Sequence, residues 1–230
     1  MIILHEEMPE EALVAANALE TAYEISSEIK PIDLEGTFRP IPEFNGYAHS
    51  SWELLERTIP IRVISGNPKT KAILVLTPRD LYFGESQEDD WILGYSVSNV
   101  SVITNARMKR DDGQPSDKLE VSKDLYHKRL SVMAVHEVGH DVVLGQHFKP
   151  AFWVNAQTGH ELELGGHCID NSCTMYEVVD IKAPQPQEGH LRLGEEKRFD
   201  AGLDDVIERL KPGYLCNDCR SSVRINESYR

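Results

Sequence analysis

The sequence predicts an α+β fold with a small C-terminal subdomain stabilised by a metal ion. Three observations support this prediction. Residues 71–77 (KAILVLT) form a continuous apolar run, as expected for a strand covered on both faces. Residues 122–144 have the pattern of one long helix. The last third of the chain has weak helix and strand signals but contains four clustered cysteines.

Composition narrows the possible functions. With 230 residues the chain is the size of one domain and can bury a stable core without help from disulfides or bound metals. Its net charge of −14 argues against nucleic acid and against an anionic membrane surface as partners. No apolar run is long enough to cross a membrane, and the N-terminus lacks the basic start of a secretory signal. We therefore expect a cytoplasmic protein; the sequence gives no indication of its oligomeric state.

Strands and helices are expected to alternate in the first part of the chain. Residues 2–4 form a short apolar run typical of a strand. Pro9–Tyr23 is expected to be a helix, because it opens with Pro and two Glu and is rich in Ala and Leu. Residues 27–34 are expected to be extended, 35–45 to form a loop that contains a glycine and two prolines, and 50–57 to form a short helix.

The middle of the chain is expected to complete the sheet and then to form the long helix. Residues 91–105 are rich in β-branched and aromatic side chains and predict one or two strands, in which Gly94 marks a bulge or an edge. A polar loop follows over 110–116. The long helix is expected to begin after Ser122 as its N-cap and to end at Gly145.

The C-terminal part is expected to be largely irregular. Residues 184–190 predict a loop, and 201–210 predict the last helix. This pattern divides the chain into an N-terminal α/β subdomain over residues 1–145 and a C-terminal subdomain over 146–230.

The most informative motif is HEVGH, which lies inside the predicted long helix. His136 and His140 are four residues apart and share one helical face, so both imidazoles can bind one metal ion. Glu137 lies beside them and can act as general base toward a metal-activated water. A catalytic zinc normally takes a third protein ligand. The compact H-E-x-x-H-x-x-G-x-x-H spacing is broken here, because Val143 and Gln146 stand at its last Gly and His positions.

The third ligand has three kinds of candidate. His167 is preferred, because the preceding glycine pair permits a tight approach to the metal. His147 is nearer in sequence, but Gly145 comes two residues late, which rotates the exit of the chain by about 200°. Glu161 or Glu163 would instead give a site of two His and one Glu.

The four cysteines predict a second metal site. They are spaced as C-x4-C and C-x2-C, and two such knuckles complete a tetrahedral, structural four-thiolate zinc site. Two disulfides are the alternative, which is disfavoured because nothing in the sequence suggests export. The predicted ligands are Cys168, Cys173, Cys216 and Cys219.

Several of these motifs resemble those of the archaemetzincins. The string from His167 through Cys168 and Cys173 to Met175 lies downstream of HEVGH and is followed by C-x-x-C. Residues 77–82 (TPRDLY), 91–94 and 106–107 are similar to the segments around the family's sheet. The resemblance covers about residues 70–223.

This resemblance implies a zincin-like (metzincin) fold, with a twisted mixed sheet, a long active-site helix and two zinc ions per chain, one catalytic and one structural. It implies that His136, His140 and His167 hold the catalytic zinc and that Glu137 is the base. Met175 would be the methionine of the Met-turn, and the four cysteines would hold the structural zinc.

The sequence departs from the family pattern at two places. Residues 146–166 resemble an insertion at the third-ligand turn, and the stretch between Met175 and Cys216 is longer than usual. The insertion carries the aromatic residues Phe148, Phe152 and Trp153, which would either form a flap or pack the loop down. Tyr176 would be either an oxyanion partner or a buried packing residue.

Three functions follow as hypotheses. The leading one is a zinc metallopeptidase that hydrolyses a peptide or protein substrate, lined up along an edge strand over 91–98. The alternative is a zinc-stabilised peptide- or protein-binding module with little or no hydrolysis. A further alternative is a gluzincin-like peptidase that uses Glu161 or Glu163.

Overall fold

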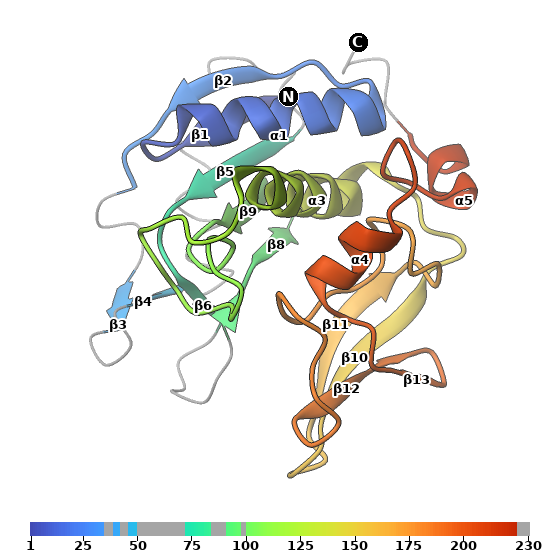
Figure 1. Ribbon diagram of the computed structural model, residues 1–230. Coiled ribbons are helices and arrows are strands. Elements are labelled where there is room, and N and C mark those ends of the chain that lie inside the picture. The colour runs from blue at the N-terminus through green and yellow to red at the C-terminus, as the bar shows by residue number, and fades with distance from the viewer. Residues whose placement is uncertain (35–38, 42–45, 50–71, 84–90, 98–99, 225–230) are drawn as a thin grey trace.

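The structure of the protein is a computed structural model (Figure 1). The described residues form a five-stranded sheet, two four-stranded sheets and the helices α1, α3, α4 and α5. They comprise residues 1–34, 39–41, 46–49, 72–83, 91–97 and 100–224. Within this part of the chain, no helix combines the length and the apolar character needed to cross a membrane.

The main sheet has the strand order β2-β1-β5-β9-β8. The first four strands are parallel, and β8 runs antiparallel to β9 at the edge. Their bounds are β1 Ile2–His5, β2 Glu28–Pro31, β5 Ile73–Thr77, β8 Gly94–Val97 and β9 Val100–Thr104.

Alternating side chains of this sheet enter two hydrophobic cores. Leu74 and Leu76 of β5 face the core that contains helices α1 (Pro9–Tyr23) and α3 (Lys123–Val142). Ile73 and Val75 face a smaller core on the other side. β5 is therefore covered on both faces, as its apolar run predicts. α1 and α3 lie against each other beside the sheet in Figure 1.

Helix α3 begins as predicted but ends earlier than predicted. The Ser122 hydroxyl accepts a hydrogen bond from the Leu125 amide at 3.2 Å, which makes Ser122 the N-cap. The helix ends at Val142 and not at Gly145. The physical reason is pairing with the C-terminal tail, because Val143 is extended and forms a bridge with Val223.

The predicted irregular C-terminal part contains a second sheet, so that expectation was wrong. β10 (Lys149–Asn155) and β11 (Glu161–His167) come from the predicted insertion, while β12 (Gly189–Leu193) and β13 (Glu196–Arg198) come from the long stretch after Met175. They pair antiparallel in the order β11-β10-β12-β13. The two departures from the family pattern thus form one structural unit, and β11 ends at His167.

A third sheet has the order β3-β4-β6-β7. β3 falls inside residues 35–45, which were predicted to be a loop, so this prediction was wrong at residues 39–41. The predicted helix over 50–57 lies outside the described residues. Residues 91–105 form three strands, one more than predicted, because β7 and β8 are separated at Leu93. The bounds are β3 Arg39–Ile41, β4 Gly46–His49, β6 Leu81–Phe83 and β7 Trp91–Ile92.

Two short helices complete the fold. α4 (Leu203–Arg209) lies within the predicted last helix, but α5 (Asn217–Ser221) follows it and was not predicted. A fully buried arginine joins α4 to α3: the guanidinium of Arg129 donates to both carboxylate oxygens of Asp204 at 2.7 Å.

Candidate metal centres

Three histidines converge at the C-terminal half of α3. One ring nitrogen from each of His136, His140 and His167 lies within 4.8 Å of the others. The Nε2 atoms of His136 and His140 are 3.2 Å apart. Two nitrogens that bind one tetrahedral zinc at about 2.0–2.1 Å are about 3.3 Å apart, so this spacing suits a shared metal ion.

The His136 ring is oriented by the backbone of the segment that follows the first two cysteines. Its Nδ1 lies 2.7 Å from the carbonyl oxygen of Thr174, which fixes Nδ1–H as the donor and leaves Nε2 free to bind a metal. Burial lowers the pKa values of His136 and, more strongly, of His140, where the neighbouring His136 and His167 add to the effect. Both rings are thereby kept neutral, as metal ligands require.

His167 is held at the same place by β11 and by a glutamate. Its side chain is 1% exposed, and Nε2 lies 2.5 Å from Oε2 of Glu177. The Nδ1 atom of His167 is buried without a hydrogen-bond partner. Burial alone would raise the pKa of Glu177, but the attraction of His167 and His136 outweighs it, so the pKa is lowered.

Glu137 lies on the same helix, beside the edge strand β8. Burial, and to a lesser extent the charges of Glu177 and Asp141, raises the pKa of its carboxyl group well above the usual range. A Cβ atom at Gly94 of β8 would lie 2.7 Å from Glu137 Oε1. Because glycine has no side chain, Gly94 leaves room for the carboxylate of Glu137.

Met175 packs directly on α3 between the two helix histidines. A Cβ atom at Gly139 would overlap the Met175 sulfur, so the contact depends on glycine. The Tyr23 hydroxyl of α1 donates to the Val135 carbonyl oxygen at 2.8 Å and lies 3.8 Å from Met175 Sδ. Tyr23 thus connects α1 both to Met175 and to the turn of α3 that carries the histidines.

The four cysteines are all buried and reduced, and they lie near one another. The Sγ atoms of Cys168 and Cys216 are 3.7 Å apart, far beyond a disulfide bond but close to the spacing of about 3.8 Å between two thiolates on a tetrahedral zinc. The Cys216 amide donates to Cys173 Sγ at 3.3 Å, and the Cys219 amide to Cys216 Sγ at 3.4 Å. Hydrogen bonds from Cys168 and Cys219 lower the pKa of Cys173.

His147 lies with the cysteines and not with the histidines. Its Nε2 is 3.1 Å from Cys219 Sγ, and it groups with Cys168, Cys216 and Cys219 within 4.8 Å. The sequence included His147 among the candidates for the third ligand of the catalytic centre; the structure brings His167 there instead.

The remaining candidates lie elsewhere. Glu161 pairs with Arg192 at 2.6 Å, and Glu163 is four residues before His167 on the extended strand β11, about 13 Å along the chain. Neither joins the histidine group. The Tyr176 hydroxyl donates to Asp200 at 2.7 Å in the interior, which agrees with a packing role.

Two residues at these sites were missed by sequence reasoning. Glu177 follows Met175 by two residues, and nothing in the local sequence pattern distinguishes this buried acid from the many surface acids of the chain. Gly94 was recognised as a bulge or edge signal, but its contact with Glu137 spans two elements far apart in sequence.

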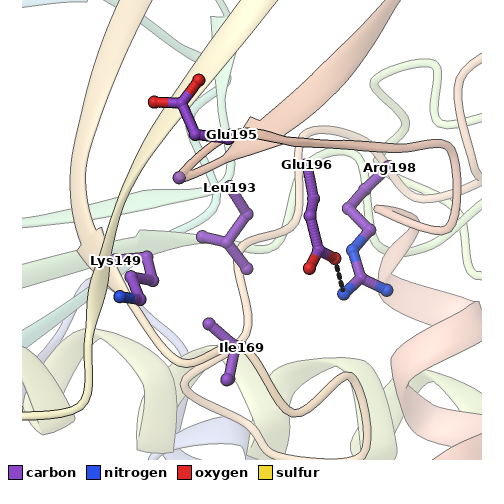
Figure 2. Close-up of a pocket in the computed structure, with 7 residues that line it drawn as sticks. Lys149, Ile169, Leu193, Glu195, Glu196 and Arg198 are labelled. Atoms are coloured by element: carbon purple, nitrogen blue, oxygen red, sulfur yellow. Dashed lines mark hydrogen bonds and ion pairs between the residues drawn. The ribbon is translucent and has the colours of Figure 1, made fainter.

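A surface hollow of about 400 Å³ lies beside the second sheet (Figure 2). Figure 2 shows the aliphatic side chains of Ile169 and Leu193 within it and an ion pair of 2.7 Å between Glu196 and Arg198 at its side. None of the residues that line it belongs to the histidine or cysteine groups. Its lining consists of Lys149, Ile169, Leu193, Gly194, Glu195, Glu196 and Arg198.

Solved structures of known proteins share this fold. A zinc-dependent peptidase from Methanocorpusculum labreanum (strain Z) aligns with a TM-score of 0.56 and 18% identity over 97% of this chain and 99% of that one. Archaemetzincin from Archaeoglobus fulgidus aligns with a TM-score of 0.53 and 20% identity over 97% and 100%. Archaemetzincin from Methanopyrus kandleri gives 0.50 and 17% over 96% and 91%.

These similarities confirm the archaemetzincin resemblance at the level of the fold. No family model matches the chain, and no curated protein sequence matches it. The chain therefore has an archaemetzincin-like α+β fold, with two donor groups, one of three histidines and one of cysteines with a histidine, that are suited to zinc.

Proposed function

We propose that the protein is a zinc-dependent metallopeptidase whose catalytic zinc is held by His136, His140 and His167. The observation that carries the proposal is the convergence of three buried ring nitrogens beside a buried glutamate on one helix. Three histidine ligands leave a fourth position open on a tetrahedral zinc, which is the arrangement of catalytic zinc sites. The zinc-dependent peptidases that share the fold support the same proposal.

The donor set fits zinc in two further respects. Nitrogen donors suit zinc, and the 3.2 Å between Nε2 of His136 and Nε2 of His140 agrees with shared ligation. His167 is buried without a hydrogen-bond partner at Nδ1, an arrangement that costs free energy unless a ligand or metal compensates it. When bound, the zinc would supply Lewis-acid activation of a water molecule and of the scissile carbonyl group.

Glu137 is the proposed general base. Its carboxylate would accept the proton of the attacking water and later pass it to the leaving amine. Burial raises the pKa of this carboxyl group, which makes it a stronger base toward the proton of the water. Thr174 would hold His136 in the ligating tautomer through the bond from Nδ1.

The proposed substrate is an extended peptide that adds to strand β8. β8 is the outermost described strand of the main sheet and pairs only with β9 in that sheet. Its Gly94 lies against Glu137, so a peptide paired with β8 would pass close to the base. The proposal also includes a cytoplasmic location and excludes nucleic acid and membranes as partners, on the charge and sequence grounds given above.

The second zinc is proposed to be structural and bound by Cys168, Cys173, Cys216 and Cys219. Because Cys168 directly follows His167, this site would anchor the third ligand of the catalytic centre. The gluzincin-like alternative has less support, since Glu161 is engaged by Arg192 and lies at the far end of β11.

The test is peptide cleavage by the zinc-loaded chain and by Glu137→Gln. A peptide library is incubated with each protein, and the products are identified by mass spectrometry. We expect the substitution to lower the cleavage rate by about 10²–10⁴-fold while zinc content stays unchanged, because a general base contributes about this factor.

The matched control is Asp124→Asn, which removes an exposed acid from the same helix and is expected to cleave like the parent. Equal cleavage by Glu137→Gln would remove the glutamate from the mechanism. No cleavage by a parent that carries both zinc ions would favour the binding module instead.

A further inference from the structure

We propose that His147 is a positioning residue of the cysteine metal site and that its Nε2–H donates a hydrogen bond to the thiolate of Cys219. It would act from outside the four thiolate ligands. The inference rests on the proposed second zinc but not on peptidase activity.

The end of helix α3 brings His147 to the C-x-x-C segment. Past Val142 the chain pairs with the residues after α5: the Leu144 amide donates to the Ser222 carbonyl at 3.0 Å, and the Arg224 amide donates to the Val142 carbonyl at 2.8 Å. These two bonds, with the bridge between residues 143 and 223, bind the exit of α3 to the segment that carries Cys219.

The next aromatic residue fixes the direction of the imidazole. The rings of His147 and Phe148 meet edge to face, with centroids 5.0 Å apart at 76°. Phe148 in turn fills the space above Gly145, where any Cβ atom would overlap its ring. Gly145, the glycine expected to end the helix, therefore leaves room for the Phe148 ring, and this ring contacts the imidazole of His147.

The distances favour a hydrogen-bond donor over a metal ligand. A nitrogen and a sulfur that bind the same tetrahedral zinc at about 2.05 and 2.3 Å are about 3.5 Å apart. The 3.1 Å from His147 Nε2 to Cys219 Sγ is clearly shorter, whereas the 3.7 Å between Cys168 and Cys216 matches two shared ligands. Cys173 stands outside the group that His147 forms with the other three cysteines, but its sulfur accepts from the Cys216 amide at 3.3 Å and would complete the set of four thiolates.

The charge of such a site explains why a donor is needed. Zinc with four thiolates carries a net double negative charge, which is costly to bury unless hydrogen bonds compensate it. Backbone amides supply three donors: Asp170 to Cys168, Cys216 to Cys173 and Cys219 to Cys216. His147 supplies the donor for the fourth sulfur, Cys219, so that each thiolate accepts at least one hydrogen bond.

The test is the zinc and cobalt binding of three full-length variants. His147→Leu removes the donor, His147→Gln restores an N–H near the position of Nε2, and His160→Leu changes an exposed histidine at the β10–β11 turn as the control. Transfer of zinc from the cysteine site to a chromophoric chelator is timed, and the thiolate-to-metal charge-transfer band of the Co²⁺-loaded protein is recorded.

We expect His147→Leu to release zinc about 10–100-fold faster, as loss of an outer hydrogen bond to a metal ligand commonly does, with the Co²⁺ band still that of four thiolates. His147→Gln should recover most of the slow release, and His160→Leu should behave like the parent. A Co²⁺ band of three thiolates in the parent would make His147 a ligand and overturn the proposal.

Unchanged release in His147→Leu would also overturn it. A parent without metal at the cysteines would instead refute the second zinc itself. Because neither readout uses peptide cleavage, failure of the proposed peptidase activity is a separate outcome.

Discussion

The main sheet and the second sheet are stabilised in different ways. In the main sheet, β5 and β9 are buried along their whole length, and two helices pack on one face. In the second sheet, β11 is largely exposed and ends beside two groups of metal-ligand side chains. Burial of apolar surface on both faces therefore shapes the first region, whereas the second contributes Ala151, Leu191 and Leu193 to the core and ends at side chains suited to a metal ion.

Removal of metal is expected to separate the two regions most strongly. A structural zinc contributes on the order of 10 kcal/mol to the folding of small zinc domains. After treatment with a chelator, we expect amide exchange to accelerate in α5 and in residues 168–176, while β1, β5 and β9 stay protected. Hydrogen exchange followed by mass spectrometry measures this difference.

The His136→Ala variant is the control for this experiment, because it should lose the histidine-bound zinc alone and keep α5 protected. Equal loss of protection in both regions would show that they unfold as one unit and would contradict the comparison.

The ion pair between Arg129 and Asp204 tests the polar anchoring of α4. Arg129 is fully buried, and its Nη1 group also donates to two backbone carbonyls. Asp204→Asn removes the bidentate partner of this buried charge and leaves Asp111 Oδ1, at 3.6 Å, as its remaining carboxylate contact among the described residues. We therefore expect a loss of about 3 kcal/mol in the free energy of unfolding, the lower end of the range for breaking a buried pair. Asp205→Asn removes the neighbouring acid of the same helical turn and should cost less than 1 kcal/mol.

The same pair predicts a pH dependence. Burial would raise the pKa of Asp204, but the bonds from Arg129 and Lys182 outweigh it, so the folded-state pKa is below the ordinary value. The stabilisation is therefore present above the unfolded-state pKa and is lost as the pH falls through the folded-state pKa. Denaturant unfolding should show the parent and Asp204→Asn converging toward low pH; a difference that grows there would contradict this assignment.

Gly94→Ala tests how the main sheet shapes the histidine centre. The new methyl group would meet Glu137 Oε1 at 2.7 Å and Ile103 Cγ2 at 2.9 Å, so the carboxylate must move. We expect cleavage to fall by about 10²-fold, the effect of displacing a catalytic group by about 1 Å, with zinc content retained. Gly159→Asn at the β10–β11 turn, where nothing lies within 4 Å, is the control. Undiminished cleavage by Gly94→Ala would show that this space is not needed.

Glu177→Gln tests the smallest expected effect, the support of His167 by its neighbour. Loss of a carboxylate beside a ligating histidine lowers metal affinity by about 10–100-fold in known sites. Competition with a chelator of known zinc affinity measures this for the histidine site. Glu195→Gln, an exposed acid in the β12–β13 turn, should bind zinc like the parent. An unchanged zinc affinity in Glu177→Gln would show that β11 positions His167 without help from Glu177.

The elements that could be predicted from the sequence are those with strong local patterns. The apolar run of β5, the bounds of α1 and the Ser122 cap of α3 each depend on neighbouring residues, and the structure agrees with them. The HEVGH motif likewise lies on one turn of helix.

The second sheet could not be predicted as a unit, because its two hairpins are joined by β10 and β12, which pair 34 to 42 residues apart (Asn155 with Gly189, Ala151 with Leu193). The place of His147 depends on pairing between the exit of α3 and the C-terminal tail, and no local pattern contains that pairing. Glu177 acts through one contact with His167, which the sequence does not mark.

The most direct test of the account is a crystal structure of the metal-loaded chain with anomalous scattering recorded at the zinc edge. We expect two zinc peaks, one bound by His136, His140 and His167 and the other by the four cysteines, with His147 against Cys219. A single peak at the cysteines, with the three histidines apart, would contradict it.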